Sequence, residues 1–424
     1  MNPSDLLDPL LGPGFKGYPA LAPALRRSQV GGQGWNLLAG DLPLPLAVLK
    51  RAPLQHNLGW MQRLVAAQGI ALAPHGKTTM SPQLFAQQLA AGAWGITFAN
   101  VQQLAIGVAS GVRRALIANQ VVQRPDLQHL AALLDRHADL RVVFLVDAPE
   151  QIALVAQAAL PRPLDVLVEL GLAGGRTGCR THEAALALAR AAHASPAVRL
   201  AGIACYEGLW GSGESEADTR MAQGLMQRVH TLATACDAEG LFDSDEVIVT
   251  AGGSALFDLV APALKPVLRK PVQGLLRSGC YLTHDDGFYR RMVNVANQRL
   301  GCAEGDGLRA ALQLWCVVQS LPEPGLAILG CGKRDLSFDM GLPVPLLHCA
   351  AGSTAPQAVP EGWSISALND QHAYLRTGDA PHGLQVGDRL ALGISHPCTT
   401  FDKWRWMPVV DEAWNVVDAI TTQF

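Results

Sequence analysis

Charged residues are scarce in this sequence. Asp, Glu, Lys and Arg make up 16% of its 424 residues, and the formal net charge is only −3. The chain therefore carries no broad basic field, which argues against nucleic acid or an anionic membrane as a partner. No apolar run approaches the ~20 residues that a membrane-spanning helix requires. Apolar residues account for 49% of the chain, which is typical of an α/β enzyme with buried parallel strands.

Organised cysteine motifs are missing as well. The nine cysteines form no Cys-x-x-Cys pair and no regular framework. Their odd number and the size of the chain favour reduced thiols, as in a cytoplasm. The first residues, Met1 to Asp5, lack the cationic start and apolar stretch of a signal peptide, so we expect a cytoplasmic protein.

Short apolar runs alternate with Ala/Leu-rich amphipathic segments through the middle of the chain. Eight such runs separated by segments with helical periodicity favour a (β/α)₈ TIM-like barrel. They lie at residues 70–73, 95–98, 115–118, 141–146, 165–170, 200–205, 246–250 and 274–277. The alternative is an open doubly wound sheet, but no Gly-x-Gly-x-x-Gly turn follows the first run.

The pattern changes after about residue 295, where helical periodicity fades and Pro and Gly clusters separate short β-type runs. These runs lie at residues 310–320, 326–330, 363–366, 389–394 and 416–421. We therefore expect an α/β barrel followed by an all-β domain. The predicted parts are an N-terminal segment at residues 1–44 that packs on the β domain, a barrel at residues 45–295, and a mostly β domain at residues 296–424.

Lys77 is the first candidate for chemistry. It lies in the segment Pro74-His75-Gly76-Lys77-Thr78, just after the first run of the expected barrel. Active residues of such barrels collect at the C-terminal ends of the strands. A lysine that faces a pocket there can form a Schiff base with an aldehyde. The ordinary alternative is a surface lysine in a strand-to-helix loop.

Two further strand ends are rich in glycine. Arg176 lies in the turn at residues 171–178, where it could donate a hydrogen bond to a ring nitrogen of a flat ligand, or simply be exposed. Gly252, Gly253 and Ser254 follow a late run, and free N–H groups in such a turn can cradle phosphate. The next run ends at Gly279 and Cys280. Ordinary βα turns are the alternative for both segments.

A possible metal pair lies near the C-terminus. His396 and Cys398 flank a proline at the end of an expected strand, so their side chains would point the same way. An imidazole and a thiolate can hold one zinc ion and leave positions for water or substrate. Two ligands do not prove a metal, and a histidine and a cysteine at the end of a core strand remain the alternative. Asp402 could orient a metal-bound histidine, or simply lie at the surface.

In this order and spacing, the segments resemble the D-threonine aldolase and D-serine dehydratase family of pyridoxal-phosphate enzymes, which share the alanine-racemase-like fold. The resemblance runs from about residue 40 to the end of the chain. It rests on residues 74–78, 88–97, 116–119, 202–208, 250–253 and 396–400.

The resemblance implies a role for each of these residues. Lys77 carries pyridoxal 5'-phosphate as a Schiff base, Arg176 faces the pyridine nitrogen, and Tyr206 lies near the cofactor. His396 and Cys398 bind a divalent metal, zinc in the dehydratases, with manganese as the other candidate. The phosphate is held by Gly252, Gly253, Ser254, Gly279 and Cys280. A homodimer with the active site near its interface is also implied.

The His-x-Cys pair resembles the dehydratase branch, because the aldolase branch is expected to have His-x-Asp. Two departures leave the substrate open. Residues 330–332 read Gly-Cys-Gly where the family often has Asp-Ala-Gly, and residues 370–372 read Asp-Gln-His where Glu-Glu-His is common.

The leading hypothesis is β-elimination from a D-β-hydroxy amino acid such as D-serine, giving a keto acid and ammonia. Lys77 would be the base at Cα, and the metal would assist departure of the hydroxyl. The alternative is aldol cleavage to glycine and an aldehyde, with His75 or His372 as the base on the hydroxyl. Racemisation needs a second base that no residue clearly supplies. A non-catalytic carrier of the cofactor would need neither the β domain nor the His396 and Cys398 pair.

Overall fold

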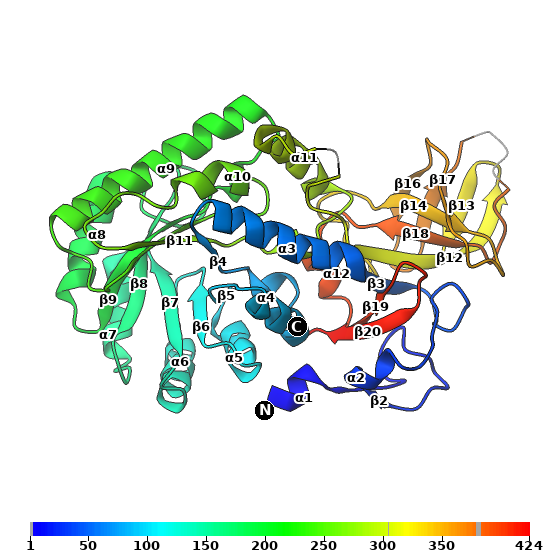
Figure 1. The fold of residues 1–424 in the computed structure, drawn as a ribbon, viewed down its shortest axis with the longest axis horizontal. Coiled ribbons are helices and arrows are strands. Elements are labelled where there is room, and N and C mark those ends of the chain that lie inside the picture. The colour runs from blue at the N-terminus through cyan, green and yellow to red at the C-terminus, as the bar shows by residue number, and fades with distance from the viewer. Residues whose placement is uncertain (1–2, 304, 379–382) are drawn as a thin grey trace.

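The computed structural model describes residues 3–303, 305–378 and 383–424. Figure 1 shows a ring of strands with helices outside it, next to a second body built mainly of strands. This arrangement confirms the predicted barrel and C-terminal β domain. Within the described ranges, no helix is both long enough and apolar enough to cross a membrane.

Eight parallel strands form the barrel in the order β4-β11-β10-β9-β8-β7-β6-β5. The edge strands β4 and β5 meet through an isolated parallel bridge between His75 and Thr97, which closes the ring. The strands are almost entirely buried because the helices cover them, which explains their continuous apolar runs. They are β4 (Ala71–Leu72), β5 (Ile96–Phe98), β6 (Arg114–Ile117), β7 (Arg141–Val146), β8 (Leu164–Leu170), β9 (Val198–Cys205), β10 (Val247–Ala251) and β11 (Val272–Leu276).

A helix follows each of these strands, and the helix starts have local causes. The side chains of Asn100 and Thr181 accept hydrogen bonds from the first turns of α5 and α8, and a proline occupies the first turn of α4, α6 and α7. The helices are α4 (Pro82–Ala90), α5 (Val101–Ala109), α6 (Arg124–Arg136), α7 (Pro149–Gln157), α8 (His182–Ala194), α9 (Ser215–Ala238), α10 (Phe257–Val260) and α11 (Phe288–Leu300), and α3 (Arg51–Ala67) precedes β4.

The β domain is one branched, mostly antiparallel sheet. Its main path runs β15-β14-β18-β12-β13-β17-β16, and β3, β19 and β20 join it beside β12. The elements are β3 (Leu46–Lys50), β12 (Leu312–Glu323), β13 (Leu326–Leu329), β14 (Val344–Cys349), β15 (Gln357–Ala358), β16 (Ser364–Leu368), β17 (Ala373–Arg376), β18 (Arg389–Gly393), α12 (Cys398–Phe401), β19 (Trp406–Val410) and β20 (Val416–Thr421).

Strand β3 departs from the sequence-based division of the chain. We assigned it to the barrel, which would begin at residue 45, but it pairs antiparallel with β12 and parallel with β19. Its first four residues are apolar and buried, as in a barrel strand, so the run itself predicts a strand but not its partners.

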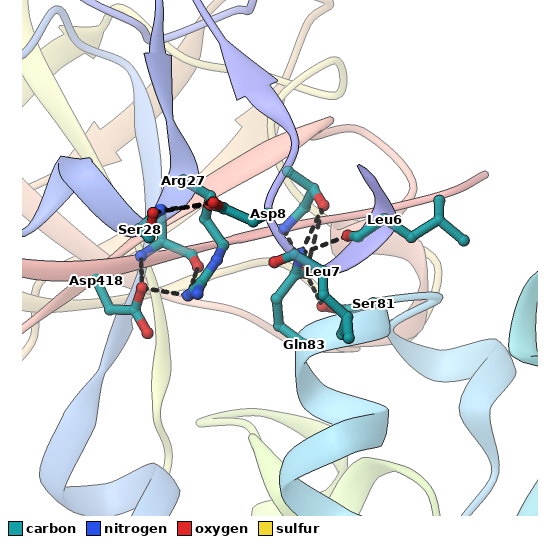
Figure 2. Close-up of polar contacts among 10 residues, drawn as sticks. Leu6, Leu7, Asp8, Arg27, Ser28, Ser81, Gln83 and Asp418 are labelled. Carbon is teal, nitrogen blue, oxygen red and sulfur yellow. Dashed lines mark hydrogen bonds and ion pairs between the residues drawn. The ribbon is translucent and has the colours of Figure 1, made fainter. Parts of the chain in front are cut away.

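The N-terminal segment contacts both domains. It contains α1 (Pro3–Leu7), β1 (Leu10–Leu11), β2 (Leu25–Arg26) and α2 (Arg27–Val30). The Arg27 guanidinium lies 2.5 Å from the carboxylate of Asp418 in β20, and Ser28 donates hydrogen bonds to Asp8. Figure 2 shows both contacts. The Gln83 amide of α4 donates to the carbonyl oxygens of Leu6 and Leu7.

Gln83 also reaches the β domain, because its Oε1 accepts a hydrogen bond of 3.0 Å from the backbone N–H of Thr421. One buried amide therefore joins the N-terminal segment, the barrel and the β domain. Trp404 and Trp406 lie nearby in the core, where their indole N–H groups donate to the backbone oxygens of Asp335 and Lys16. Both tryptophans thus have the packing role that burial implies.

Candidate functional site

The predicted residues gather where the barrel strands end. Close packing of the turns depends on two glycines. A Cβ atom on Gly253 would lie 2.9 Å from the Tyr206 ring, and one on Gly279 would lie 2.6 Å from Thr78 Oγ1. Both distances are too short for a real contact, so only glycine lets the turns after β4, β9, β10 and β11 converge.

Lys77 lies in a single 3-10 turn, Gly76–Thr78, directly after β4. The turn is held in place because Gly76 packs tightly against the side chains of Phe85 and Ile96. The Lys77 side chain is exposed in the single chain, which differs from the expectation that it faces a pocket rather than water.

His75 precedes this lysine by two residues and is close to three positively charged side chains. Burial lowers the pKa of His75 well below its usual value, and the nearby charges of Lys77, Arg277 and Arg176 lower it further. The ring is therefore neutral at physiological pH. Within the described residues, its buried Nδ1 has no hydrogen-bond partner. A neutral imidazole of such low basicity is a weak general base.

Arg176 and Tyr206 face one another from the turns after β8 and β9. The guanidinium carbon of Arg176 lies 4.9 Å from the centre of the Tyr206 ring, within the range of a cation–π contact. Burial raises the pKa of Tyr206 to about 12, with a further contribution from Glu207. Tyr206 is therefore a neutral hydroxyl at physiological pH, suited to hydrogen bonding rather than to proton abstraction.

Gly252 and Gly253 do not offer their N–H groups to a phosphate, contrary to the sequence-based expectation. Both groups donate to the fully buried carboxylate of Glu207, at 2.9 and 2.7 Å. Gly252 has φ +96°, a conformation that favours glycine, and this directs the two N–H groups toward the same acceptor. The N–H groups of this turn are thus satisfied by a carboxylate of the protein itself.

The third cluster combines both domains. The ligand atoms of Cys280, His396 and Cys398 all lie within 4.8 Å of one another. Cys280 was expected to contribute to the phosphate site, but its Sγ lies 3.7 Å from Cys398 Sγ. Its backbone N–H donates to Ser254 Oγ at 3.1 Å. Cys398 begins the short helix α12 rather than lying on a strand, so a helical turn, not strand alternation, brings it beside His396.

Asp339 orients the histidine of this cluster. His396 Nδ1 lies 2.7 Å from one carboxylate oxygen of Asp339, and Thr399 donates to the other oxygen at 2.6 Å. Burial lowers the pKa of His396, but the hydrogen bonds and charges of Cys398 and Asp339 outweigh it and raise this pKa to about 9. Asp402, the residue proposed from the sequence, pairs instead with Lys403.

Thr78 connects the cluster to the lysine turn. Its Oγ1 lies 3.4 Å from Cys398 Sγ and 4.0 Å from Cys280 Sγ, and Thr78 is the next residue after Lys77. The lysine, the Arg176 and Tyr206 pair and the sulfur cluster therefore belong to one site at the barrel mouth. His372 lies elsewhere, in the exposed turn between β16 and β17 beside Lys333 and Asp370.

The sequence did not predict three side-chain groups of this site, namely the carboxylates of Glu207 and Asp339 and the thiol of Cys280. Glu207 stood next to a predicted residue, and Cys280 was considered only for its backbone. Only the folded chain shows which way these side chains point.

Comparison with known proteins agrees with this architecture. A family model described as "Alanine racemase, N-terminal domain" matches residues 49–265, and one described as "Putative serine dehydratase domain" matches residues 311–410. The chain is 29% identical over 373 residues to D-threonine aldolase of Arthrobacter sp, covering 84% of this chain and 86% of that protein. It is 27% identical over 374 residues to D-threo-3-hydroxyaspartate dehydratase of Delftia sp. (strain HT23), covering 85% and 92%.

Among solved structures, D-threonine aldolase from Filomicrobium marinum superimposes with a TM-score of 0.77 at 24% identity, covering 92% of this chain and 97% of that one. The match extends over both the barrel and the β domain, so the relative placement of the two parts is shared.

Proposed function

Because this chain belongs to the family of the alanine racemase N-terminal domain, we propose that it is a pyridoxal-phosphate- and metal-dependent lyase. The proposed reaction is β-elimination from a D-3-hydroxy amino acid, which yields a keto acid and ammonia. One observation carries this proposal: Thr78, the neighbour of Lys77, lies 3.4 Å from the sulfur of Cys398. An amine that can hold an aldehyde and a thiol cluster that can hold a metal thus share one site.

The residues at the mouth fit pyridoxal phosphate. Lys77 supplies an accessible amine for the aldehyde, Arg176 and Tyr206 would flank the ring, and Ser254 with the Gly279 turn would hold the phosphate. The buried Nδ1 of His75 has no hydrogen-bond partner among the described residues, so it is a polar atom that a bound group could satisfy. When bound, the cofactor supplies an electron sink that makes the Cα–H bond of the substrate acidic.

The sulfur and imidazole donors fit a divalent metal. Thiolate and imidazole are ligands that zinc prefers, and oxygen ligands, which suit manganese better, are not part of this donor set. Asp339 would fix the imidazole ring, because a carboxylate on the other nitrogen orients a metal-binding histidine. When bound, the metal supplies a Lewis acid for a departing hydroxyl group.

Lys77 is the proposed base for the Cα proton, since it is the accessible amine at the mouth of the barrel. Tyr206 keeps its proton and holds its place against Arg176, whose guanidinium donates hydrogen bonds but no proton. His75 remains neutral because burial and the neighbouring positive charges lower its pKa. The cluster of His396 and Cys398 lies beside Thr78, the neighbour of Lys77, so a metal held there would be in position to assist a departing hydroxyl group.

A second candidate reaction is aldol cleavage to glycine and an aldehyde, favoured by the similarity to D-threonine aldolase. It needs a base on the β-hydroxyl. His75 is a poor choice because its pKa is strongly lowered, and His372 is in an exposed turn of the β domain. The His396-Pro397-Cys398 sequence, with cysteine rather than aspartate two residues after the histidine, also supports elimination.

We also propose a homodimer whose second subunit covers the open mouth. In the single chain Lys77 is exposed, and the loop that carries Asp339 exposes Phe338, Met340 and Leu342 to solvent. Exposed apolar residues gathered in one loop are typical of an interaction surface. Light scattering that gives the mass of one chain at working concentration would contradict this arrangement.

A panel of D-amino acids tests the reaction, with ammonia, keto acid, glycine and aldehyde measured together. Metal is first removed with a chelator, and zinc and manganese are then restored separately. Elimination predicts equal amounts of ammonia and keto acid, and activity that depends on the metal. Glycine with aldehyde would support the second candidate, and unchanged turnover without metal would refute the metal role.

Lys77→Ala is the test of the cofactor anchor. The visible absorbance of the cofactor bound to the lysine should disappear, whereas survival of that absorbance would mean that another residue holds it. A protein that binds the cofactor through Lys77 but forms no product from any D-amino acid would be a carrier rather than a lyase.

A further inference from the structure

The sulfur of Cys280 lies where a third metal ligand would be. Cys280 begins a short turn, Cys280–Leu282, directly after the barrel strand β11, whereas His396 and Cys398 come from the β domain. Cys280 is only 4% exposed, and its ligand atom lies within 4.8 Å of those of the other two residues.

The spacing of the two sulfurs matches tetrahedral coordination. Two thiolates bound at ~2.3 Å to one tetrahedral zinc ion are about 3.8 Å apart. Cys280 Sγ and Cys398 Sγ are 3.7 Å apart. The two sulfurs therefore already have the separation at which both could bind one ion, although a thiol–thiol hydrogen bond has the same length.

The cluster is held rigidly from both domains. The backbone N–H of Cys280 bonds to Ser254, and Gly279 packs against the lysine turn, which fixes Cys280 on the barrel side. The hydrogen bond to Asp339 fixes His396 on the other side. A donor set prepared in this way is what a tight metal site requires.

We propose that Cys280 is a metal ligand together with His396 and Cys398, which gives a site with two sulfurs and one nitrogen. This inference rests on the proposed metal site of the lyase and adds a third protein ligand to it. Three protein ligands leave the fourth tetrahedral position open for an oxygen of the substrate, the pattern of catalytic zinc sites. Two thiolates make the site selective for zinc over manganese or magnesium.

X-ray absorption at the zinc edge counts the sulfur ligands directly, in the holoenzyme and without reference to activity. We expect two sulfurs at about 2.3 Å in the wild-type protein and one in Cys280→Ser. The matched control Cys302→Ser changes a partly buried cysteine outside the cluster and should retain two. A single sulfur in the wild-type protein would overturn the proposal, even if Cys280→Ser failed to fold.

Two further measurements separate this inference from the metal site itself. Dialysis against equal zinc and manganese, followed by metal analysis, should give almost only zinc in the wild-type protein and a mixture in Cys280→Ser. Chelator competition should show zinc affinity at least ~100-fold weaker in that variant, because loss of a ligand costs more than loss of a supporting carboxylate. If His396→Ala and Cys398→Ser lose the metal while Cys280→Ser binds it normally, only the third ligand is refuted. If all three variants bind it normally, the proposed metal site is wrong.

Discussion

Replacing Glu207 by glutamine should weaken cofactor binding, although Glu207 lies beneath the proposed binding surface. The buried carboxylate accepts the N–H groups of Gly252 and Gly253 and so fixes the turn that precedes Ser254. Glutamine keeps one acceptor oxygen but places an NH₂ group against the other N–H. One hydrogen bond to a charged group is then lost, and two donors face each other.

The magnitude follows from these two hydrogen bonds. A hydrogen bond to a charged acceptor contributes about 1.5–3 kcal/mol, so Glu207→Gln should cost about 2 kcal/mol in the ordering of the turn. A cost of about 2 kcal/mol corresponds to roughly 30-fold in an equilibrium constant. If phosphate binding requires the ordered turn, the dissociation constant of pyridoxal phosphate should rise by up to this factor.

The assay is titration of cofactor-free protein with pyridoxal phosphate, followed by its absorbance when bound. Glu216→Gln is the matched control, because that side chain is 91% exposed on α9 and its ion pair with Arg220 is exposed. It should bind the cofactor normally, as exposed ion pairs contribute little. Equal affinity of Glu207→Gln and wild-type protein would refute the idea that the filled turn supports the phosphate site.

Three other perturbations have defined outcomes. Asp339→Asn should weaken metal affinity ~10–100-fold in chelator competition, since the carboxylate that orients His396 is lost. Burial raises the pKa of Asp285 from its usual 3.8 to about 7. The protonated carboxyl therefore contributes most to stability below pH ~4, and this contribution is lost as pH rises to 7. Urea unfolding should show stability falling between pH ~4 and pH 7, and Asp285→Asn should reduce this fall. Gln83→Ala leaves buried partners in three parts of the chain unpaired. Denaturant unfolding should show that the protein loses about 1–3 kcal/mol of stability for each of these partners. The control Gln87→Ala, on the same helix, should have little effect.

The barrel could be predicted from the sequence because its strands are nearly continuous apolar runs. β7 was predicted at residues 141–146 and β8 at residues 165–170, and the structure has Arg141–Val146 and Leu164–Leu170, so pattern and structure agree within a residue. The strands of the β domain were harder to predict from the sequence. β14 contains Pro345 and alternates poorly, and β17 is only four residues long, so neither rises above the surrounding loop pattern.

The site was only partly predictable, for a related reason. Spacing places Lys77, Arg176 and Tyr206 at strand ends, and strand ends of a barrel meet. Spacing does not show the direction of a side chain in a one-turn helix. The direction of Cys280 is set by its hydrogen bond to Ser254 and by the close approach at Gly279, two tertiary contacts with no trace in the local pattern.

Strand β3 has a consequence for how the chain is made on the ribosome. It is synthesised before the whole barrel, whereas its partners β12 and β19 are synthesised after it. A nascent chain can therefore close the barrel while β3 is still an unpaired apolar segment. Such a segment can aggregate, and molecular chaperones bind segments of this kind. The complete sheet of the β domain can assemble only once β20 has left the exit tunnel.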